Sequence, residues 1–200
     1  RVGNDDFGRA LLNNLRSVNI NTDFVTVDPD AATGIALITV EDSGENNIVL
    51  ASGSNMRLSV TDIEAAEEAI AQADVVLFQL ESPVPTVEAG LKLAKKHGVA
   101  TLLNPAPAQP LSDALLSCVD ILAPNETEAA LLTGRPVATI AQIEEAAEHL
   151  RRTGVGTVIV TLGERGAFLC SAEGNAMFPA YPIEPVDTTA AGDAFVAGFA

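Results

Sequence analysis

The spacing of hydrophobic and polar positions changes at Asp62. Beyond it, short continuous apolar runs alternate with stretches in which apolar residues recur at helical spacing. Continuous apolar runs are typical of strands buried on both faces, and their alternation with helices predicts a parallel sheet covered on both sides. The expected strands are 74–79, 99–103, 120–123 and 157–161, and the expected helices are 63–72, 84–97, 111–117, 126–132 and 140–152.

Before Asp62 the pattern is shorter and more polar. Leu11, Leu12, Leu15 and Val18 predict a helix after an opening turn, and 24–27 predicts a short strand. Two β-rich runs, 33–40 and 47–51, flank a polar turn at 41–46 and predict a hairpin. A further antiparallel pair, 167–171 with 176–180, is expected late in the chain.

Polar, turn-forming segments follow each of the four buried strands. They are 79–83, 104–107, 124–128 and 161–166. In an open parallel sheet, ligands bind beyond the carboxyl ends of the strands. These segments offer carboxylates, amides and backbone N–H groups, so we expect them to line one cleft.

The segment from Val186 to Asp193 places two carboxylates around small residues, and an apolar run from 194 to 200 follows. If this turn opens a helix, its N–H groups and the helix dipole form an anion site. The alternative is an ordinary helix start capped by Asp187 or Thr189.

Length and composition set limits on the function. Two hundred residues suffice for one core, so we expect a single domain over 1–200. A formal net charge of −16 disfavours binding to nucleic acids or to an anionic membrane. Cys118 and Cys170 stand far apart, which is typical of a reduced, cytoplasmic protein. No apolar run is long enough to span a membrane, and no signal peptide is visible.

These motifs, in this order, resemble the PfkB (ribokinase) family of carbohydrate kinases. The segment 187–193 is similar to the second signature of that family. Asn125-Glu126-Thr127-Glu128, Asn104-Pro105-Ala106-Pro107, Leu80-Glu81-Ser82-Pro83 and Thr161-Leu162-Gly163 occur in the family's order. The P-loop and dinucleotide motifs are absent. The resemblance covers the whole length and implies a three-layer α/β fold, with a parallel sheet between helices and a small β-sheet lid.

The resemblance also implies the residues of phosphoryl transfer. Asp193 is expected to be the base that takes the proton from a sugar primary hydroxyl, and Ala190, Ala191 and Gly192 to form the anion hole.

Asn125 and Glu128 are expected to hold the phosphates and Mg²⁺, although a plain capping box at a helix start is the alternative. Thr161 and Gly163 are expected to contact the phosphates of ATP.

Two further sites follow from the resemblance. Asp187 and Thr189 are expected to bind K⁺, with a simple turn role for Asp187 as the alternative. Glu81 is expected to contact a sugar hydroxyl, with a solvated turn carboxylate as the alternative. The hairpin 33–51 is expected to be the lid, and the lid to pair two subunits in a homodimer.

The implied activity is ATP-dependent conversion of D-ribose to D-ribose 5-phosphate. Fructose, 2-keto-3-deoxygluconate or a nucleoside are alternative substrates, and an inert sugar- or nucleotide-binding fragment is a third hypothesis. The family's glycine-rich first signature does not occur in the chain. We therefore expect the chain to be a piece of a longer kinase that folds poorly by itself.

Overall fold

The computed structural model describes residues 1–40, 46–184 and 188–200. The chain divides into two compact units. The first comprises residues 1–68 with 81–86, and the second comprises 69–80 with 87–200. The expectation of a single domain over 1–200 with a lid at 33–51 stays a prediction.

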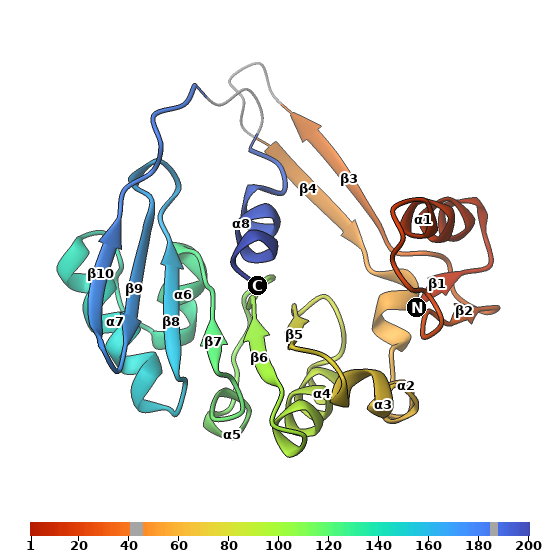
Figure 1. The fold of residues 1–200 in the computed structure, drawn as a ribbon. Helices are drawn as coiled ribbons and strands as arrows, with labels where there is room; N and C mark the ends of the chain where they lie inside the picture. Colours follow the sequence, from red (N-terminus) through yellow and green to blue (C-terminus); the bar gives the residue numbers. More distant parts are fainter. Residues whose placement is uncertain (41–45, 185–187) are drawn as a thin grey trace. The chain divides into compact units, whose positions relative to one another are not determined.

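The second unit is built on a six-stranded sheet (Figure 1). Strand order follows the chain in reverse, β10-β9-β8-β7-β6-β5. Strands β5 to β8 are parallel, whereas β9 and β10 are antiparallel, which confirms both predicted features. The strands are β5 Val75–Phe78, β6 Ala100–Leu103, β7 Ile121–Leu122, β8 Thr157–Thr161, β9 Ala167–Ser171 and β10 Gly174–Phe178.

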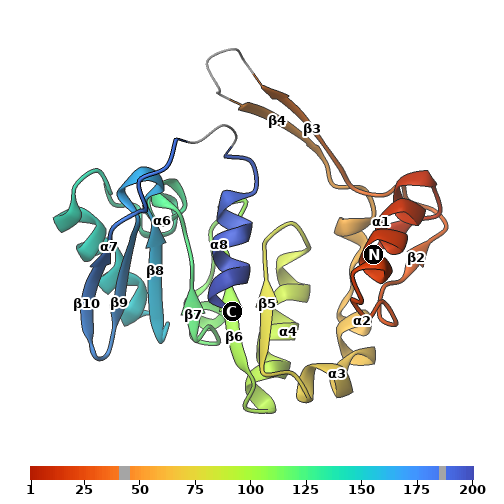
Figure 2. The same cartoon turned by 45° about the horizontal axis from the view of Figure 1, so that its top comes forward.

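Helices lie on both faces of this sheet. Figures 1 and 2 show α7 behind strands β8 to β10 and α8 in front of β6. Val196 of α8 is buried against Leu102 of β6 and Ala123, while Ile143 and Leu150 of α7 are fully or almost fully buried. The helices are α4 Val84–Lys96, α5 Asp113–Leu116, α6 Glu126–Thr133, α7 Ile140–Arg152 and α8 Ala191–Phe199, with a 3₁₀ turn η2 at Gly163–Arg165.

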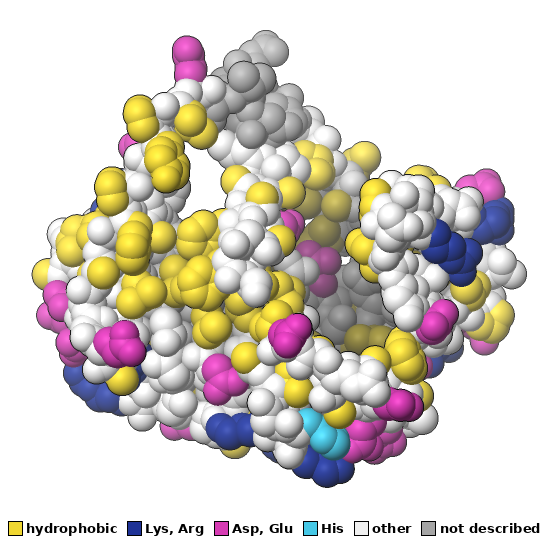
Figure 3. All heavy atoms as spheres, in the orientation of Figure 1, with side chains coloured by type: hydrophobic (Ala, Val, Ile, Leu, Met, Phe, Trp, Pro, Cys, Tyr) yellow, Lys and Arg dark blue, Asp and Glu magenta, His cyan; other side chains and the backbone are white. Residues whose placement is uncertain are grey.

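The face that carries α8 keeps an apolar surface. Figure 3 shows hydrophobic side chains gathered where β8, β9 and α8 lie. Phe195 and Phe199 of α8 stack with their ring centroids 6.5 Å apart and remain 37% and 44% exposed. Helix α8 therefore covers only part of this face.

The described part of the first unit contains two small sheets and several short helices. Strands β1 Val2–Gly3 and β2 Val27–Asp28 are parallel, and helix α1 spans Asp6–Ser17. The predicted hairpin is confirmed in its described part. It consists of β3 Ile35–Val40 and β4 Asn46–Ala51, with Ile35 paired to Ala51 at its base. Residues 41–45 of the expected turn lie outside the described residues.

Two predictions before residue 72 were wrong. The expected strand 24–27 begins only at Val27, because Val27 and Asp28 are the residues that pair with β1. The expected helix 63–72 is two helices, α2 Val60–Ala65 and α3 Glu67–Ala71, which follow the 3₁₀ turn η1 Gly53–Arg57. Helix α2 starts earlier because Ser59 and Asp62 form a capping box.

The start of α2 is also tied to the N-terminus by charge. Arg1 donates two hydrogen bonds to the Asp62 carboxylate, from Nε at 3.0 Å and from Nη2 at 2.9 Å. Asp28, which is 1% exposed, accepts from Arg57 at 2.7 Å and from Arg1 at 3.2 Å. A buried carboxylate needs such partners, so this cluster fixes β2 against α2 and η1. None of the described helices is both long and apolar enough to span a membrane.

Candidate active site

The polar segments after the parallel strands lie side by side at one edge of the second unit's sheet. The Leu80 N–H donates to the Ala106 carbonyl at 2.8 Å, and the Thr161 N–H donates to the Pro124 carbonyl at 2.9 Å. Asn104 joins the two middle strand ends, because its Nδ2 donates to the Ala123 carbonyl at 2.9 Å. Strand ends 79–80, 104–107, 124–128 and 161–166 therefore form one continuous rim.

Helix α6 begins at this rim with a complete capping box. The Asn125 side chain accepts from the Glu128 N–H at 2.8 Å, and the Glu128 carboxylate accepts from the Asn125 N–H at 2.7 Å. The capping role, which the sequence left as an alternative, is thus present. Glu128 is 7% exposed, and burial raises the pKa of its carboxyl group, although the Asn125 N–H partly offsets this.

Thr161 and Gly163 lie next to this helix start. Asn125 and Thr161 form an isolated parallel bridge, so the two expected phosphate contacts are neighbours. Gly163 has φ +56°, a left-handed conformation that costs glycine little. Arg165 forms an ion pair with Glu126 and also donates to the Ala138 carbonyl at 3.3 Å. Sequence reasoning missed this ion pair, which joins the turn after β8 to the start of α6.

Helix α8 begins in a different way. Its N-cap residue is Ala190, in the left-handed conformation (φ 59°, ψ 16°), and an alanine side chain cannot accept a capping hydrogen bond. The N-cap position therefore falls on Ala190 and not on Thr189, and Asp187 lies outside the described residues. The helix starts at Ala191, which places Asp193 in its first turn. The Ala191 N–H donates to the Thr188 carbonyl at 3.1 Å. Space beside Gly192 is open, because an added Cβ would meet no atom within 4 Å.

Asp193 is exposed in the first turn of α8. Its Oδ1 accepts a hydrogen bond from Nε2 of Gln79, at the end of β5, at 2.8 Å. Because an amide donor carries no charge, Gln79 orients the carboxylate without neutralising it. The two residues are 114 positions apart in the chain, and sequence reasoning did not connect them. The signal that could have drawn attention to Gln79 is its place at the end of a buried strand.

The structure does not test the roles expected of the remaining residues. Glu81 lies on an exposed turn of the first unit, and Thr189 is exposed in the second. Among the described residues, no group of three or more His, Cys, Asp and Glu side chains could hold a metal ion. The roles assigned to these residues stay predictions.

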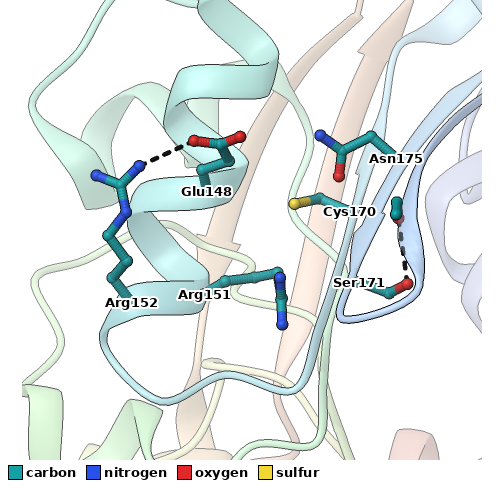
Figure 4. Close-up of a pocket in the computed structure, with 7 residues that line it drawn as sticks. Glu148, Arg151, Arg152, Cys170, Ser171 and Asn175 are labelled. Atoms are coloured by element: carbon teal, nitrogen blue, oxygen red, sulfur yellow. Dashed lines mark hydrogen bonds and ion pairs between the residues drawn. The ribbon is translucent and has the colours of Figure 1, made fainter.

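A cavity of about 370 Å³ lies away from this rim (Figure 4). It is at the other end of β9 and β10, since Ser171 pairs with Gly174 there while Ala167 pairs with Thr161 at the rim. Of the two arginines that line it, Arg152 pairs with Glu148 at 2.8 Å and Arg151 donates to the Gly156 carbonyl at 3.2 Å. Burial raises the pKa of the Cys170 thiol, which makes it a poor nucleophile. We assign this cavity no part in the chemistry.

The geometry of the rim and of α8 agrees with a comparison to known families. The whole chain, residues 1–200, matches the pfkB family of carbohydrate kinases. The chain belongs to the pfkB carbohydrate kinase family.

Curated members of the pfkB family resemble the chain throughout. A ribokinase of Haemophilus influenzae is 43% identical over 198 residues, which is 99% of this chain and 65% of that protein. A deoxyribokinase of Salmonella typhi is 40% identical over 201 residues, which is 100% of this chain and 66% of that protein. The chain thus spans slightly less than two thirds of the length of each of these kinases.

Solved structures of pfkB-type kinases share the fold. An Arabidopsis thaliana ribokinase complexed with ribose and ATP is 32% identical, with a TM-score of 0.87 over 100% of this chain and 66% of that one. An E. coli protein provisionally assigned as ribokinase II, in complex with ATP and Mg²⁺, is 26% identical, with a TM-score of 0.79 over 98% of this chain and 65% of that one. The ribokinase-like α/β fold expected from the sequence is confirmed.

Proposed function

We propose that the protein containing this chain is an ATP-dependent sugar kinase that converts D-ribose to D-ribose 5-phosphate. The observation that carries the proposal is the position of Asp193. It lies in the first turn of a helix whose N-cap residue, Ala190, has no side chain that could accept a hydrogen bond, and Gln79 orients it. A carboxylate beside an open helix N-terminus can act on a hydroxyl that faces a phosphate.

In this reaction Asp193 accepts the proton of the sugar's primary hydroxyl as its oxygen bonds to the γ-phosphorus of ATP. The bond from that phosphorus to the bridging oxygen breaks, and ADP leaves with the electron pair. The N–H groups of Ala190 and Gly192 at the start of α8 stabilise the negative charge on the transferring group, and that of Ala191 joins them when it leaves the Thr188 carbonyl. One well-placed donor of this kind lowers a barrier by about 3 kcal/mol.

Glu128 and Asn125 suit a Mg²⁺ ion that comes with ATP. The residues that the structure describes do not form a cage of carboxylates, and one oxygen of Glu128 already accepts from the Asn125 N–H. Mg²⁺ retains much of its water and is commonly bound by one or two carboxylates with substrate phosphates. Glu128 would therefore hold it mainly through water. Bound there, the ion would neutralise charge on the phosphates.

Three finer features remain part of this proposal. K⁺ binds through Asp187 and Thr189 and activates the enzyme; replacing K⁺ with Na⁺ in the assay tests this. Glu81 contacts a hydroxyl of the sugar. The protein works in the cytoplasm, as its free thiols at Cys118 and Cys170 suggest.

The sugar specificity is tested with a substrate panel. The natural protein at full length should phosphorylate D-ribose in preference to 2-deoxyribose, fructose, 2-keto-3-deoxygluconate and adenosine, with ATP and Mg²⁺ present. Deoxyribose is the strongest competitor, because a deoxyribokinase is nearly as similar to the chain as the ribokinase is. A preference for another sugar would replace ribose in the proposal. Phosphorylation of none of them would refute the kinase activity.

The hairpin supports a homodimer. Leu37 and Val49 are cross-strand partners, yet they are 67% and 62% exposed. Beside β3, an apolar groove of about 600 Å³ runs along α1, lined by Phe7, Ala10, Leu11, Asn14 and residues 34–37. Such a contiguous apolar surface marks an interaction site. A second copy of the chain would cover this surface.

Sedimentation tests the dimer. Leu37→Lys should convert a dimer of the natural protein into a monomer. Leu131→Lys replaces a side chain on α6 that is 47% exposed, and it should leave the dimer intact. A monomeric wild-type protein would refute the dimer.

A further inference from the structure

The base of the hairpin is held by a network of short hydrogen bonds centred on Asp5 and Thr33. Asp5 Oδ1 accepts from the Thr33 hydroxyl at 2.6 Å, and Oδ2 accepts from the Thr33 N–H at 2.8 Å. The same Oδ1 accepts from the Gly8 N–H at 2.8 Å, which makes Asp5 the N-cap of α1. The Thr33 hydroxyl in turn accepts from the Gly3 N–H of β1 at 2.9 Å.

This network is closely packed. Thr33 is 4% exposed, and a Cβ at Gly3 would lie 2.5 Å from the Thr33 nitrogen, so only glycine fits there. The other end of the hairpin is tied to the same place. The N–H of Ser54, a fully buried residue, donates to the Ala32 carbonyl at 2.8 Å. Both ends of the hairpin are therefore fixed at one point.

Capping α1 does not require all of these bonds. A helix cap needs one side-chain oxygen, and the bond between Asp5 Oδ1 and Gly8 supplies it. The bond from Oδ2 reaches only to Thr33, two residues before β3. The hydrogen bonds from Thr33 and Gly8 lower the pKa of Asp5 to about 2, so the carboxylate stays ionised and accepting at neutral pH.

We propose that Asp5 and Thr33 are positioning residues for sugar phosphorylation, because they lock the hairpin to the start of α1 so that both act as one body. The proposal rests on the proposed function and on the predicted role of the hairpin as the lid over the sugar. A lid that closes on the sugar excludes water from phosphoryl transfer. A lid with a loose base binds the sugar less well and admits water.

The first experiment compares Thr33→Val with the wild type in the natural protein at full length. Valine keeps the shape and removes the hydroxyl that bonds to Asp5 and Gly3. The loss of one or two hydrogen bonds at the lid base should raise the KM for ribose about tenfold and leave the KM for ATP within about twofold. ATP hydrolysis without sugar should rise relative to sugar phosphorylation. Thr33→Ser retains the hydroxyl and should restore the wild-type values.

Thr101→Val is the matched control. Thr101 is a fully buried threonine of β6, whose hydroxyl donates to the Cys118 carbonyl at 2.9 Å and accepts from the Asp120 N–H at 2.9 Å. Thr101 makes the same kind of hydrogen bonds in the second unit, whereas the hairpin belongs to the first unit. An equal rise in the ribose KM with Thr101→Val, or no rise with Thr33→Val, would overturn the proposal.

Hydrogen exchange separates this proposal from the proposed function. In Thr33→Val the backbone amides of β3 and β4 should exchange about tenfold faster, because their base is released, while those of β6 and β8 should not change. This measurement needs no catalysis. Unchanged exchange in the hairpin would refute the lock even if the protein is a sugar kinase.

Discussion

Helices α6 and α8 both begin near the proposed phosphate site, yet their first turns differ. The start of α6 is closed by its own side chains, since Asn125 and Glu128 satisfy each other's backbone N–H groups. The start of α8 has an alanine at its cap, whose side chain cannot accept a hydrogen bond. A capped helix start has fewer N–H groups left for a ligand. We infer that α8 provides the anion hole, while α6 provides side-chain oxygens for a hydrated ion.

The most severe test of this comparison is Asp193→Asn. Asparagine keeps the size of the side chain but cannot take the proton, so the natural protein at full length should lose about 100- to 10,000-fold in kcat. Binding of ribose, measured by calorimetry, should change little. Asp113→Asn alters an exposed carboxylate in the first turn of α5 and should retain wild-type turnover. Wild-type turnover in Asp193→Asn would remove the catalytic assignment.

The closed helix start is tested by Asn125→Ala, with Thr139→Ala as its partner. Each substitution removes the cap of a complete capping box, at α6 and α7 respectively. Each should lower the free energy of unfolding by about 1 kcal/mol in urea titrations. Only Asn125→Ala should also raise the KM for ATP. An equal effect of both variants on ATP would reduce Asn125 to a capping residue.

The open helix start is tested by Ala190→Gly. A left-handed conformation is strained for alanine and accessible to glycine, so the substitution should stabilise the protein by about 0.5 to 1 kcal/mol. Thermal unfolding measures this gain. Destabilisation would show that the alanine methyl group makes contacts that outweigh the strain.

The smallest expected effect concerns the pH dependence of Glu128. Burial raises its pKa above the ordinary value of 4.5, so the folded protein holds this proton more tightly than the unfolded chain does. The free energy of unfolding therefore falls as the pH rises from about 4.5 through the raised pKa. Glu128→Gln keeps an acceptor for the Asn125 N–H and removes the charge. Relative to the wild type, it should gain stability against urea as the pH rises from about 4 to 7.

Much of the fold could be predicted because its signals are local. Helix α7 and strands β8 and β9 have the bounds expected from apolar spacing, at 140–152, 157–161 and 167–171. Where prediction failed, a different local rule decided the outcome. Ser59 caps α2 ahead of its apolar residues, and β10 begins at Gly174, two residues before the expected strand, because its pairing extends to Ser171.

The candidate site was less predictable where it depends on distant parts of the chain. The order of the strand-end motifs led to Asn125, Thr161 and Asp193, and pairing at the rim brings the first two together. The contact between Gln79 and Asp193 arises only when α8 packs over β6. The left-handed Ala190 has no signal in composition or spacing, since alanine ordinarily avoids that conformation.

The strand order of the second unit has a consequence for how the chain is made. Each strand from β6 to β10 pairs with the strand that precedes it in sequence, so no strand must wait for a partner synthesised much later. Folding is faster when contacting residues are near in sequence, and domains form progressively as the chain leaves the ribosome. The sheet can therefore grow strand by strand during translation. Helix α8, which carries Asp193 and packs on β6, follows all six of these strands in the chain, so the Asp193 carboxylate meets Gln79 only after they have been synthesised.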